Sequence, residues 1–416
     1  MSSSPNGSWC GDVRALFTLA LVLASSLAGA QGPQLSGTVE TVFGVAVDAT
    51  VPTGAVELTL TLDGDVGSGL FPDASYSATL MSGYDAATGE MRVTLDEALV
   101  TVYLGAFELS AGQQRRTWGS TDGINPVDVL NPRDLTFPPD ASKLAVPMLH
   151  AAAYADDVTV ELAVLPVFVP ALRPNADWSQ SRLPTPPPGT SLVGVLPPEE
   201  HLPGAELGNV QFGVRATLDL PAADVSATYF SGFKSQPTLS ARLEPTATPG
   251  QFQVRPVLDY DRVHVLGLDF STAIGGVVLR GETAYTLTDD PAGTDPRVGN
   301  HSLQAVLGAE YLVPGGPRTV VQAILDHTAP DQGADPEVAL KLMTALHYQA
   351  GARTNLNLGW IQSLDGSGLV MPGLSYAFAD GVTGEANAYI FYGADGSEFG
   401  GWSDNSQLRL GLAYAF

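Results

Sequence analysis

The segment QLRLGLAYAF, from Gln407 to Phe416, alternates between two kinds of side chain at every step. Every second position carries a large apolar residue: Leu408, Leu410, Leu412, Tyr414 and Phe416. The positions between them are polar or small: Gln407, Arg409, Gly411, Ala413 and Ala415. Because successive side chains of a β-strand point to opposite faces, the segment predicts a strand with one apolar face. A strand at a lipid boundary needs that pattern.

The same period of two recurs along the chain from about Leu35, and helical periodicity is hard to find. In residues 56–63, for example, valine and leucine alternate with glutamate, threonine and aspartate. A water-soluble sandwich also alternates, but its strands usually have about 5 or 6 residues. The segments here reach about 10 residues or more, the length of a tilted strand that crosses a bilayer. The sequence therefore predicts an all-β chain that forms a transmembrane antiparallel up-and-down barrel.

The alternating segments number about 18, within a range of about 14 to 18, and bacterial barrels usually have an even number. They are expected near residues 36–48, 55–64, 75–83, 90–104, 107–118, 146–155, 158–168, 208–219, 223–233, 262–272, 276–288, 300–312, 318–328, 338–349, 354–363, 368–378, 382–393 and 406–416. If both ends lie in the periplasm, the longer outer loops must follow odd-numbered strands. The longest connections, 119–145, 169–207 and 234–261, do so. The turn at 65–74 is a misfit, because it is too long for an inner turn.

The segment 184–203 is rich in proline and cannot donate a regular hydrogen-bond ladder, so it is expected to be loop. The rival interpretation is a linker between two domains. Strands of the same kind resume on both sides, which favours one barrel over residues 31–416.

The first 30 residues are typical of an export signal, with Arg14 before an apolar stretch that ends in small residues. We expect residues 1–30 to be a signal peptide cleaved near Ala30, and the mature chain to reach the outer membrane of a diderm bacterium. The single cysteine, Cys10, would leave with the signal peptide, so no disulfide is expected. No later segment is long and apolar enough to predict a transmembrane helix.

Charge and composition exclude several classes of function. The chain has 19 Lys and Arg against 44 Asp and Glu, a net charge of -25, so it repels nucleic-acid phosphates. The six histidines show no metal-ligand spacing, and Asp326-His327 lacks a nearby nucleophile, so neither an enzyme nor a cofactor or metal site is predicted. The acidic loop 326–337 lacks the fixed ligand spacing of a calcium loop and is interpreted as a solvated tip.

The stretch GQQRRTWGSTDGINPVDVLNPRD, from Gly112 to Asp134, resembles a family of porin-like outer-membrane barrels related to the alginate-export type. The shared elements are Arg115, Trp118-Gly119, Asn125-Pro126, Asp128 and Asn131-Pro132-Arg133-Asp134. Residues 262–290 and the ending LRLGLAYAF resemble the family's mid-barrel hairpin and terminal strand. The resemblance covers most of the mature chain and implies a passive or facilitated envelope channel. Gln113 stands where the family often has an arginine, which argues against an anion preference.

The same stretch supplies the candidate site, a strand end followed by a long loop with charges of both signs. An arginine and a glutamate on one strand face should point into the lumen, and the loop adds carboxylates and a second guanidinium. Opposed charges at a narrow point would set ion selectivity. The alternative is a salt-bridged brace that pins the loop to the wall, and the two are compatible. The residues concerned are Arg116, Glu108, Asp122, Asp128, Arg133 and Asp134.

Aromatic residues near the predicted strand ends are expected in the headgroup region, where amphipathic rings are favoured. They are Trp118, Tyr154, Trp360, Tyr376, Tyr389, Tyr392 and Tyr414. The alternative for them is an aromatic slide for sugars. The aromatic end of the chain, Tyr414 and Phe416, is interpreted as a signal for the barrel-assembly machinery.

These features predict a channel for passive diffusion of small solutes or ions, narrowed by the loop 119–145. The alternatives are a facilitator for hydrophobic or acidic compounds and a non-conducting structural or surface-binding barrel. Lumen-facing positions carry mostly Thr, Glu, Asp, Arg, Gln and Gly, which favours water over apolar solutes. Expected partners are membrane lipid, the assembly machinery and small-molecule solutes. The sequence does not indicate an oligomeric state.

Overall fold

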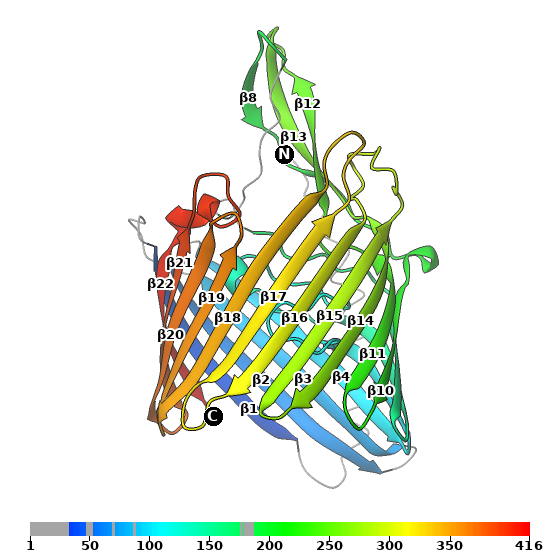
Figure 1. Ribbon diagram of the computed structural model, residues 1–416, viewed down its shortest axis with the longest axis vertical. Coiled ribbons are helices and arrows are strands. Elements are labelled where there is room, and N and C mark those ends of the chain that lie inside the picture. The colour runs from blue at the N-terminus through cyan, green and yellow to red at the C-terminus, as the bar shows by residue number, and fades with distance from the viewer. Residues whose placement is uncertain (1–32, 47–52, 69–70, 86–88, 175–177, 179–186) are drawn as a thin grey trace.

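The computed structural model describes residues 33–46, 53–68, 71–85, 89–174, 178 and 187–416. These residues form a closed antiparallel barrel of 18 strands, and each strand pairs with the next barrel strand along the chain (Figure 1). The predicted fold class and strand number are confirmed. The predicted signal peptide lies outside the described residues. Within the described part of the chain, no helix is long and apolar enough to cross a membrane.

Each predicted strand corresponds to an observed one. The barrel strands are β1 (Gln34–Ala46), β2 (Thr53–Ser68), β3 (Phe71–Asp85), β4 (Glu90–Leu104), β5 (Phe107–Gln114), β6 (Val146–Ala155), β7 (Val158–Leu165), β10 (Gln211–Asp219), β11 (Asp224–Phe233), β14 (Arg262–Ile274), β15 (Val277–Thr288), β16 (Ser302–Leu312), β17 (Arg318–Thr328), β18 (Glu337–Gly351), β19 (Thr354–Ser363), β20 (Gly368–Ala379), β21 (Val382–Tyr392) and β22 (Gln407–Ala415).

The first and last strands close the barrel. β1 pairs with β22 from Thr38 opposite Ala415 to Ala46 opposite Gln407. Gly37 and Phe416 exchange two backbone hydrogen bonds, with N to O distances of 3.0 and 2.9 Å. A closed sheet has no unpaired edge, and an unpaired edge is not tolerated in the hydrocarbon of a bilayer.

The outer surface of the barrel is apolar. Large hydrophobic side chains at alternate positions stay exposed on many of the strands, for example Leu268 on β14 at 59% and Leu307 on β16 at 59%. Such a surface is the lipid-facing band of a membrane barrel. Four of the predicted headgroup aromatics lie on this surface near strand ends: Trp360, Tyr376, Tyr392 and Tyr414.

The other three aromatics lie inside the barrel, so for them the headgroup prediction is wrong. Trp118 is only 2% exposed, and Tyr389 packs against Phe137 of an inward-folded loop. The Tyr154 hydroxyl donates to the lumen carboxylate of Glu108 at 3.4 Å. Alternate positions of a strand face lipid and lumen, so the position of a side chain in this alternation decides which side it faces. Nearness to a strand end does not.

The two rims of the barrel differ (Figure 1). Short turns such as 105–106, 156–157 and 380–381 join strands at one end, which we call the short-turn rim. The long connections leave the opposite end, the long-loop rim.

Two predicted strand boundaries are corrected. β2 continues to Ser68 and β3 begins at Phe71, so 65–74 is mostly strand and the misfit disappears. β5 ends at Gln114 instead of residue 118, because the chain turns into the barrel there.

A second, small sheet stands beyond the long-loop rim, and we call it the outer lobe (Figure 1). β8 (Ser191–Val195) and β9 (Glu199–His201) pair in parallel with β13 (Gln251–Asp259), which pairs antiparallel with β12 (Thr238–Pro245). The prediction of plain loop over 184–203 is therefore wrong for two short strands, and 234–261 is largely a hairpin. Pro197 and Pro198 fall between β8 and β9, where they interrupt no ladder.

Candidate functional site

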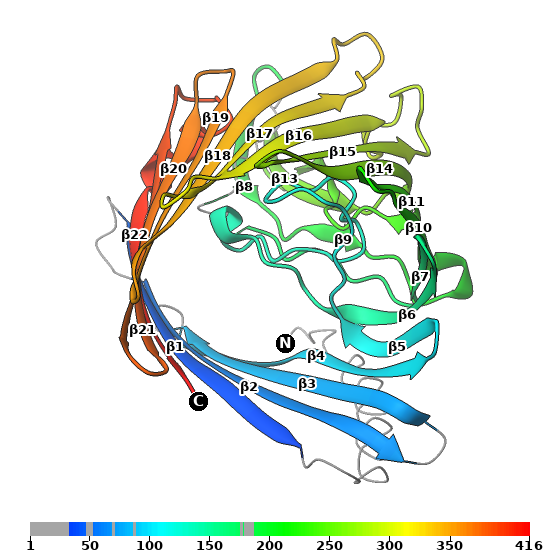
Figure 2. The ribbon, with the colours of Figure 1, turned by 60° about the horizontal axis from the view of Figure 1, so that its bottom comes forward.

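The connection between β5 and β6, residues 115–145, turns into the barrel (Figure 2). We call it the inner loop, and it contains the whole of the predicted loop 119–145. Its regular structure is limited to a bridge between Arg133 and Lys143, a bridge from Asp134 to Leu172, and the short 3-10 helix η1 (Pro138–Asp140). Its position therefore depends on contacts with the barrel wall.

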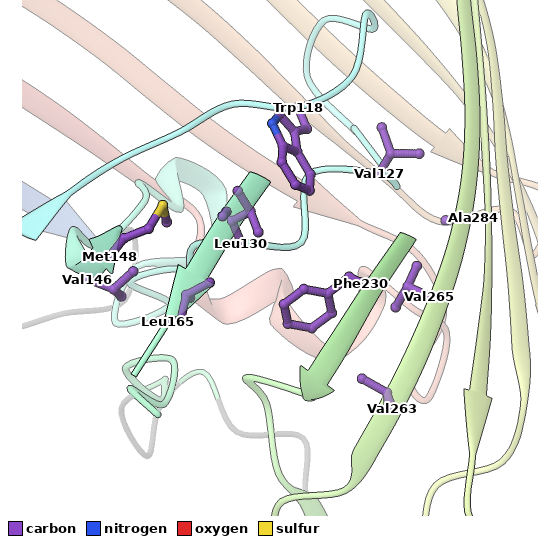
Figure 3. Close-up of a cluster of buried hydrophobic side chains, with 11 residues drawn as sticks. Trp118, Val127, Leu130, Val146, Met148, Leu165, Phe230, Val263, Val265 and Ala284 are labelled. Atoms are coloured by element: carbon purple, nitrogen blue, oxygen red, sulfur yellow. The ribbon is translucent and has the colours of Figure 1, made fainter. Parts of the chain in front are cut away.

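The first of these contacts is apolar (Figure 3). Trp118, Val127 and Leu130 of the inner loop are each at most 2% exposed. They belong to a buried cluster with the wall residues Val146, Met148, Ala163, Leu165, Phe230, Val263, Val265 and Ala284. Gly213 on β10 leaves the space, because a Cβ there would lie 2.7 Å from the Trp118 ring. Burial of each large side chain contributes about 1.5 to 3 kcal/mol, so this cluster fixes the first half of the loop.

Asn131 fastens the base of the inner loop. The residue is 6% exposed, and its Oδ1 accepts the backbone N–H of Arg116 at 2.8 Å. Its Nδ2 donates to the carbonyls of Gln114 at 3.1 Å and Leu144 at 2.8 Å. One amide thus joins the two ends of the loop. The neighbouring Pro132 carbonyl accepts the N–H of Leu144 at 2.8 Å.

The first Asn-Pro element of the predicted motif has a similar role. Asn125 donates through Nδ2 to the carbonyl of Trp118 at 2.8 Å, and Pro126 is buried beside Val127. These contacts fold residues 118–126 into a compact turn. Both Asn-Pro elements therefore shape the loop, and neither presents its side chain to the pore.

Asp128 is the charged centre of the loop. Its side chain is 2% exposed and accepts from the Lys143 ammonium at 2.5 Å, from the Arg133 guanidinium at 3.5 Å and from the backbone N–H of Trp118 at 3.3 Å. Burial lowers the pKa of Lys143 below its usual range, and Asp128 partly offsets that effect. Asp128 and Arg133 were both predicted site residues, whereas their pairing with each other was not predicted and Lys143 was not among the candidates.

Arg116 was expected to bind the loop carboxylates, and it binds its own strand instead. Its Nη2 lies 2.7 Å from the Ser110 hydroxyl and 3.4 Å from the Glu108 carboxylate. The sharp turn after β5 directs the side chain back along the lumen face. The bracing role falls to Arg115, whose guanidinium pairs with Asp96 on β4.

Glu282 on β15 binds the turn at the start of the inner loop. The residue is 4% exposed, and its carboxylate accepts the N–H groups of Ser120 and Thr121, both at 2.5 Å, and of Val127 at 3.4 Å. Gly119 has a φ of +100°, a backbone conformation that favours glycine, and a Cβ there would lie 2.6 Å from the Glu282 carboxylate. One wall carboxylate thus satisfies three backbone donors that would otherwise be buried without partners.

Asp122 links the inner loop to two further wall residues, one on β15 and one on β17. Its carboxylate lies 3.2 Å from Arg280 on β15 and 3.0 Å from Arg318 on β17. Both arginines also bind Glu310 on β16, at 2.5 and 2.6 Å. The predicted candidate Asp122 is therefore part of a four-charge cluster. Its partners were not identified from the sequence.

The second half of the inner loop crosses to the opposite wall. The Phe137 ring packs edge to face on Tyr389 of β21, with ring centres 4.9 Å apart, and on Trp178 at 5.4 Å. The Arg409 guanidinium of β22 lies over the same ring at 3.8 Å. Asp134 caps a local turn by accepting the N–H and hydroxyl of Thr136, so it is not the charge partner that was predicted. The loop therefore spans the lumen from β15 and β17 to β21 and β22.

The lumen face of β1, β2 and β21 carries carboxylates near this crossing. Glu40 on β1 is the direct cross-strand neighbour of Glu57 on β2. Glu385 on β21, Asp140 of the inner loop and Arg409 lie within electrostatic range of Glu40. None of Glu40, Glu57 and Glu385 forms an ion pair within the described part of the chain. We call these three residues the acidic wall.

Several residues of the site were missed because their signal is not local. Glu282, Arg280 and Arg318 lie more than 150 positions from the loop residues they bind. Their alternation marked them as lumen-facing, but only strand order brings them to the loop. Lys143 could have been selected from the sequence as a charge partner, since it is the one lysine in the predicted loop 119–145. Among the described residues, no group of three or more His, Cys, Asp or Glu side chains is placed to hold a metal ion.

No family model and no curated protein matches the chain. Solved structures of porins resemble it over 92% of its length. A mutant of the Rh. blastica porin shares 13% identity over 100% of that chain, with a TM-score of 0.43. Salmonella typhi OmpF, in complex with daunomycin, shares 12% over 97%, with a TM-score of 0.44. In-vitro folded OmpT of Vibrio cholerae shares 11% over 99%, with a TM-score of 0.47. At such values nothing about this chain's activity is inherited from them, and the resemblance to the alginate-export type stays a prediction.

Proposed function

We propose that the chain is an outer-membrane channel for passive diffusion of small hydrophilic solutes, with a preference for cations. The observation that carries this proposal is the asymmetry of the lumen. The first half of the inner loop packs on the walls formed by β6, β7, β11, β14 and β15, while the acidic wall lies at the far end of its crossing, on β1, β2 and β21. With the short-turn rim in the periplasm, the long-loop rim and the outer lobe face the outside.

The state of the lumen charges supports the preference for cations. Two of the lumen bases are held by carboxylates: Lys143 by Asp128, and Arg215 on β10 by Asp269 at 2.8 Å. A third, Arg409, stacks on the Phe137 ring. The three glutamates of the acidic wall form no ion pair among the described residues, and Arg409 beside Glu40 offsets only part of their combined negative charge. Rings of acidic side chains select cations in other channels. An acidic lumen also disfavours the alternative of a facilitator for acidic compounds.

The test is reversal potential in planar bilayers under a KCl gradient. We expect a K⁺ preference in the unmodified protein, and a reduced K⁺ to Cl⁻ permeability ratio in a variant with Glu40→Gln and Glu57→Gln. Glu206→Gln removes one carboxylate outside the lumen and should leave the ratio unchanged. A Cl⁻ preference in the unmodified protein would refute the charge assignment. Absence of any conductance would favour the non-conducting structural barrel.

A further inference from the structure

A pocket of about 270 Å³ lies on the lumen faces of the first strands, near the short-turn rim. None of its lining residues takes part in the contacts that hold the inner loop. Its polar lumen-facing lining is Gln34, Asp63, Asp65, Ser75, Ser77 and Thr101, and Leu99 adds one apolar side chain on the same face. The polar side chains are carboxylates, hydroxyls and one amide, and no base contributes to the lining.

The register of the strands explains how these groups come together. Asp63 and Asp65 are two residues apart on β2, so both point to the lumen. Asp63 lies opposite Ser77 and Asp65 opposite Ser75 on β3. Ser75 in turn lies opposite Thr101 on β4. Each carboxylate therefore has a hydroxyl beside it on the next strand, which is a fixed arrangement of acceptors and donors.

Two features of the pocket suit it to binding a ligand. Neither Asp63 nor Asp65 forms an ion pair with any described residue, although they are close neighbours of like charge. Thr101 is 7% exposed and lines the pocket, yet its hydroxyl forms no hydrogen bond to the described residues. The hydroxyl is therefore free to form a hydrogen bond with a group that enters the pocket. Arg116, whose side chain lies back along the lumen face of β5, is occupied by Glu108 and Ser110.

The pocket is continuous with the acidic wall. Along the pairing of β1 with β2, the lumen-facing pairs run from Glu40 and Glu57 through Thr38 and Thr59 to Ser36 and Thr61, and end at Gln34 and Asp63. This track has carboxylates at both ends and hydroxyls between them. A cation that carries its own hydroxyl groups can exchange contacts from pair to pair along it.

We propose that this pocket is a binding site for small protonated amines that carry hydroxyl groups, with Asp63 and Asp65 binding the ammonium. Ser75, Ser77 and Thr101 then bind the hydroxyls of the solute. The inference deepens the proposed function, on which it rests, because it names the class of solute that the channel retains on its way through the lumen.

The experiment compares glucosamine with glucose, which has the same size and lacks the charge. Glucosamine is added to each side of a planar bilayer in turn while single-channel current is recorded. We expect transient block by glucosamine and none by glucose. A variant with Asp63→Asn and Asp65→Asn should conduct and raise the half-blocking concentration by about tenfold, since charge-assisted contacts become neutral ones. Asp224→Asn, which removes a carboxylate at the same rim outside the pocket, should keep the block.

A second measurement separates this inference from the proposed function. Saturation-transfer NMR on the detergent-solubilised barrel detects glucosamine contact whether or not the barrel conducts. Contact that is lost in the Asp63 and Asp65 variant supports the site. Equal contact by glucose and glucosamine, or glucosamine contact that survives both substitutions, overturns it. Cation-selective conductance without any block or contact would overturn the site and leave the proposed function standing.

Discussion

Replacement of Asp128 by Asn tests whether the inner loop is held by its buried charges. Asn keeps the shape of the side chain and can still accept the N–H of Trp118. It leaves the Lys143 ammonium, whose side chain is 14% exposed, without a counter-charge. Removing one partner of a buried ion pair costs about 3 to 5 kcal/mol. Lys143 keeps two acceptors, the Arg116 carbonyl at 3.0 Å and the Thr117 hydroxyl at 2.7 Å, so the lower end of that range applies.

A loss of about 3 kcal/mol changes the ratio of docked to undocked loop by roughly 100-fold, since about 1.4 kcal/mol corresponds to a factor of ten. We therefore expect Asp128→Asn to show frequent current fluctuations in single-channel recordings, and faster proteolytic cleavage within residues 115–145. Asp134→Asn is the matched control, because Asp134 is a carboxylate of the same loop that caps a turn. It should behave as the unmodified protein. If Asp128→Asn gave the same current noise and the same cleavage rate as Asp134→Asn, the ion pair would not be what holds the loop.

Deletion of residues 408–416 removes the partner of β1, so the heat-modifiable folded form should disappear in electrophoresis; a normal yield of that form would mean that the barrel closes elsewhere. Gly213→Val places a side chain where the Trp118 ring lies, so the thermal midpoint should fall by an amount that reflects about 1 to 3 kcal/mol of overpacking. The carboxylates of Asp259 and Glu199 raise the pKa of His201 above 6.5. The stabilisation of the outer lobe by protonated His201 is therefore fully present below pH 6.5 and is lost as pH rises through the raised pKa. Proteases should cleave the outer lobe faster at about pH 8.5 than at about pH 6, and His201→Gln should remove this difference.

The sequence predicted the barrel well because the alternation of side chains is a local property of each strand. Residues 407–416 show an apolar and a polar face without reference to any other segment. The number of such segments then predicts the number of strands in the closed barrel. The inner loop was harder, because its partners come from strand order. Asp134 and Thr136 form a turn that could be inferred locally. The pairing of Asp122 with Arg318, 196 residues further along, could not.

Prediction was weakest at the outer lobe, where short strands have too few residues to display a period. β9 spans only Glu199 to His201, and its pairing with β13 is parallel. A parallel partner cannot be reached through a tight hairpin, so no turn signal in the sequence indicates it. The prolines of 184–203 predicted loop throughout, and this was wrong because β8 and β9 are short enough to lie between them.

The outer lobe is formed by two separate connections, since β8 and β9 come from the segment between β7 and β10 while β12 and β13 come from the segment between β11 and β14. Its surface is therefore a discontinuous epitope. Antibodies raised against the folded barrel should recognise neither connection as an isolated peptide. For the same reason, exchange of one connection between related barrels would leave the other without its partner, so a change in serotype at this surface requires both segments to vary together.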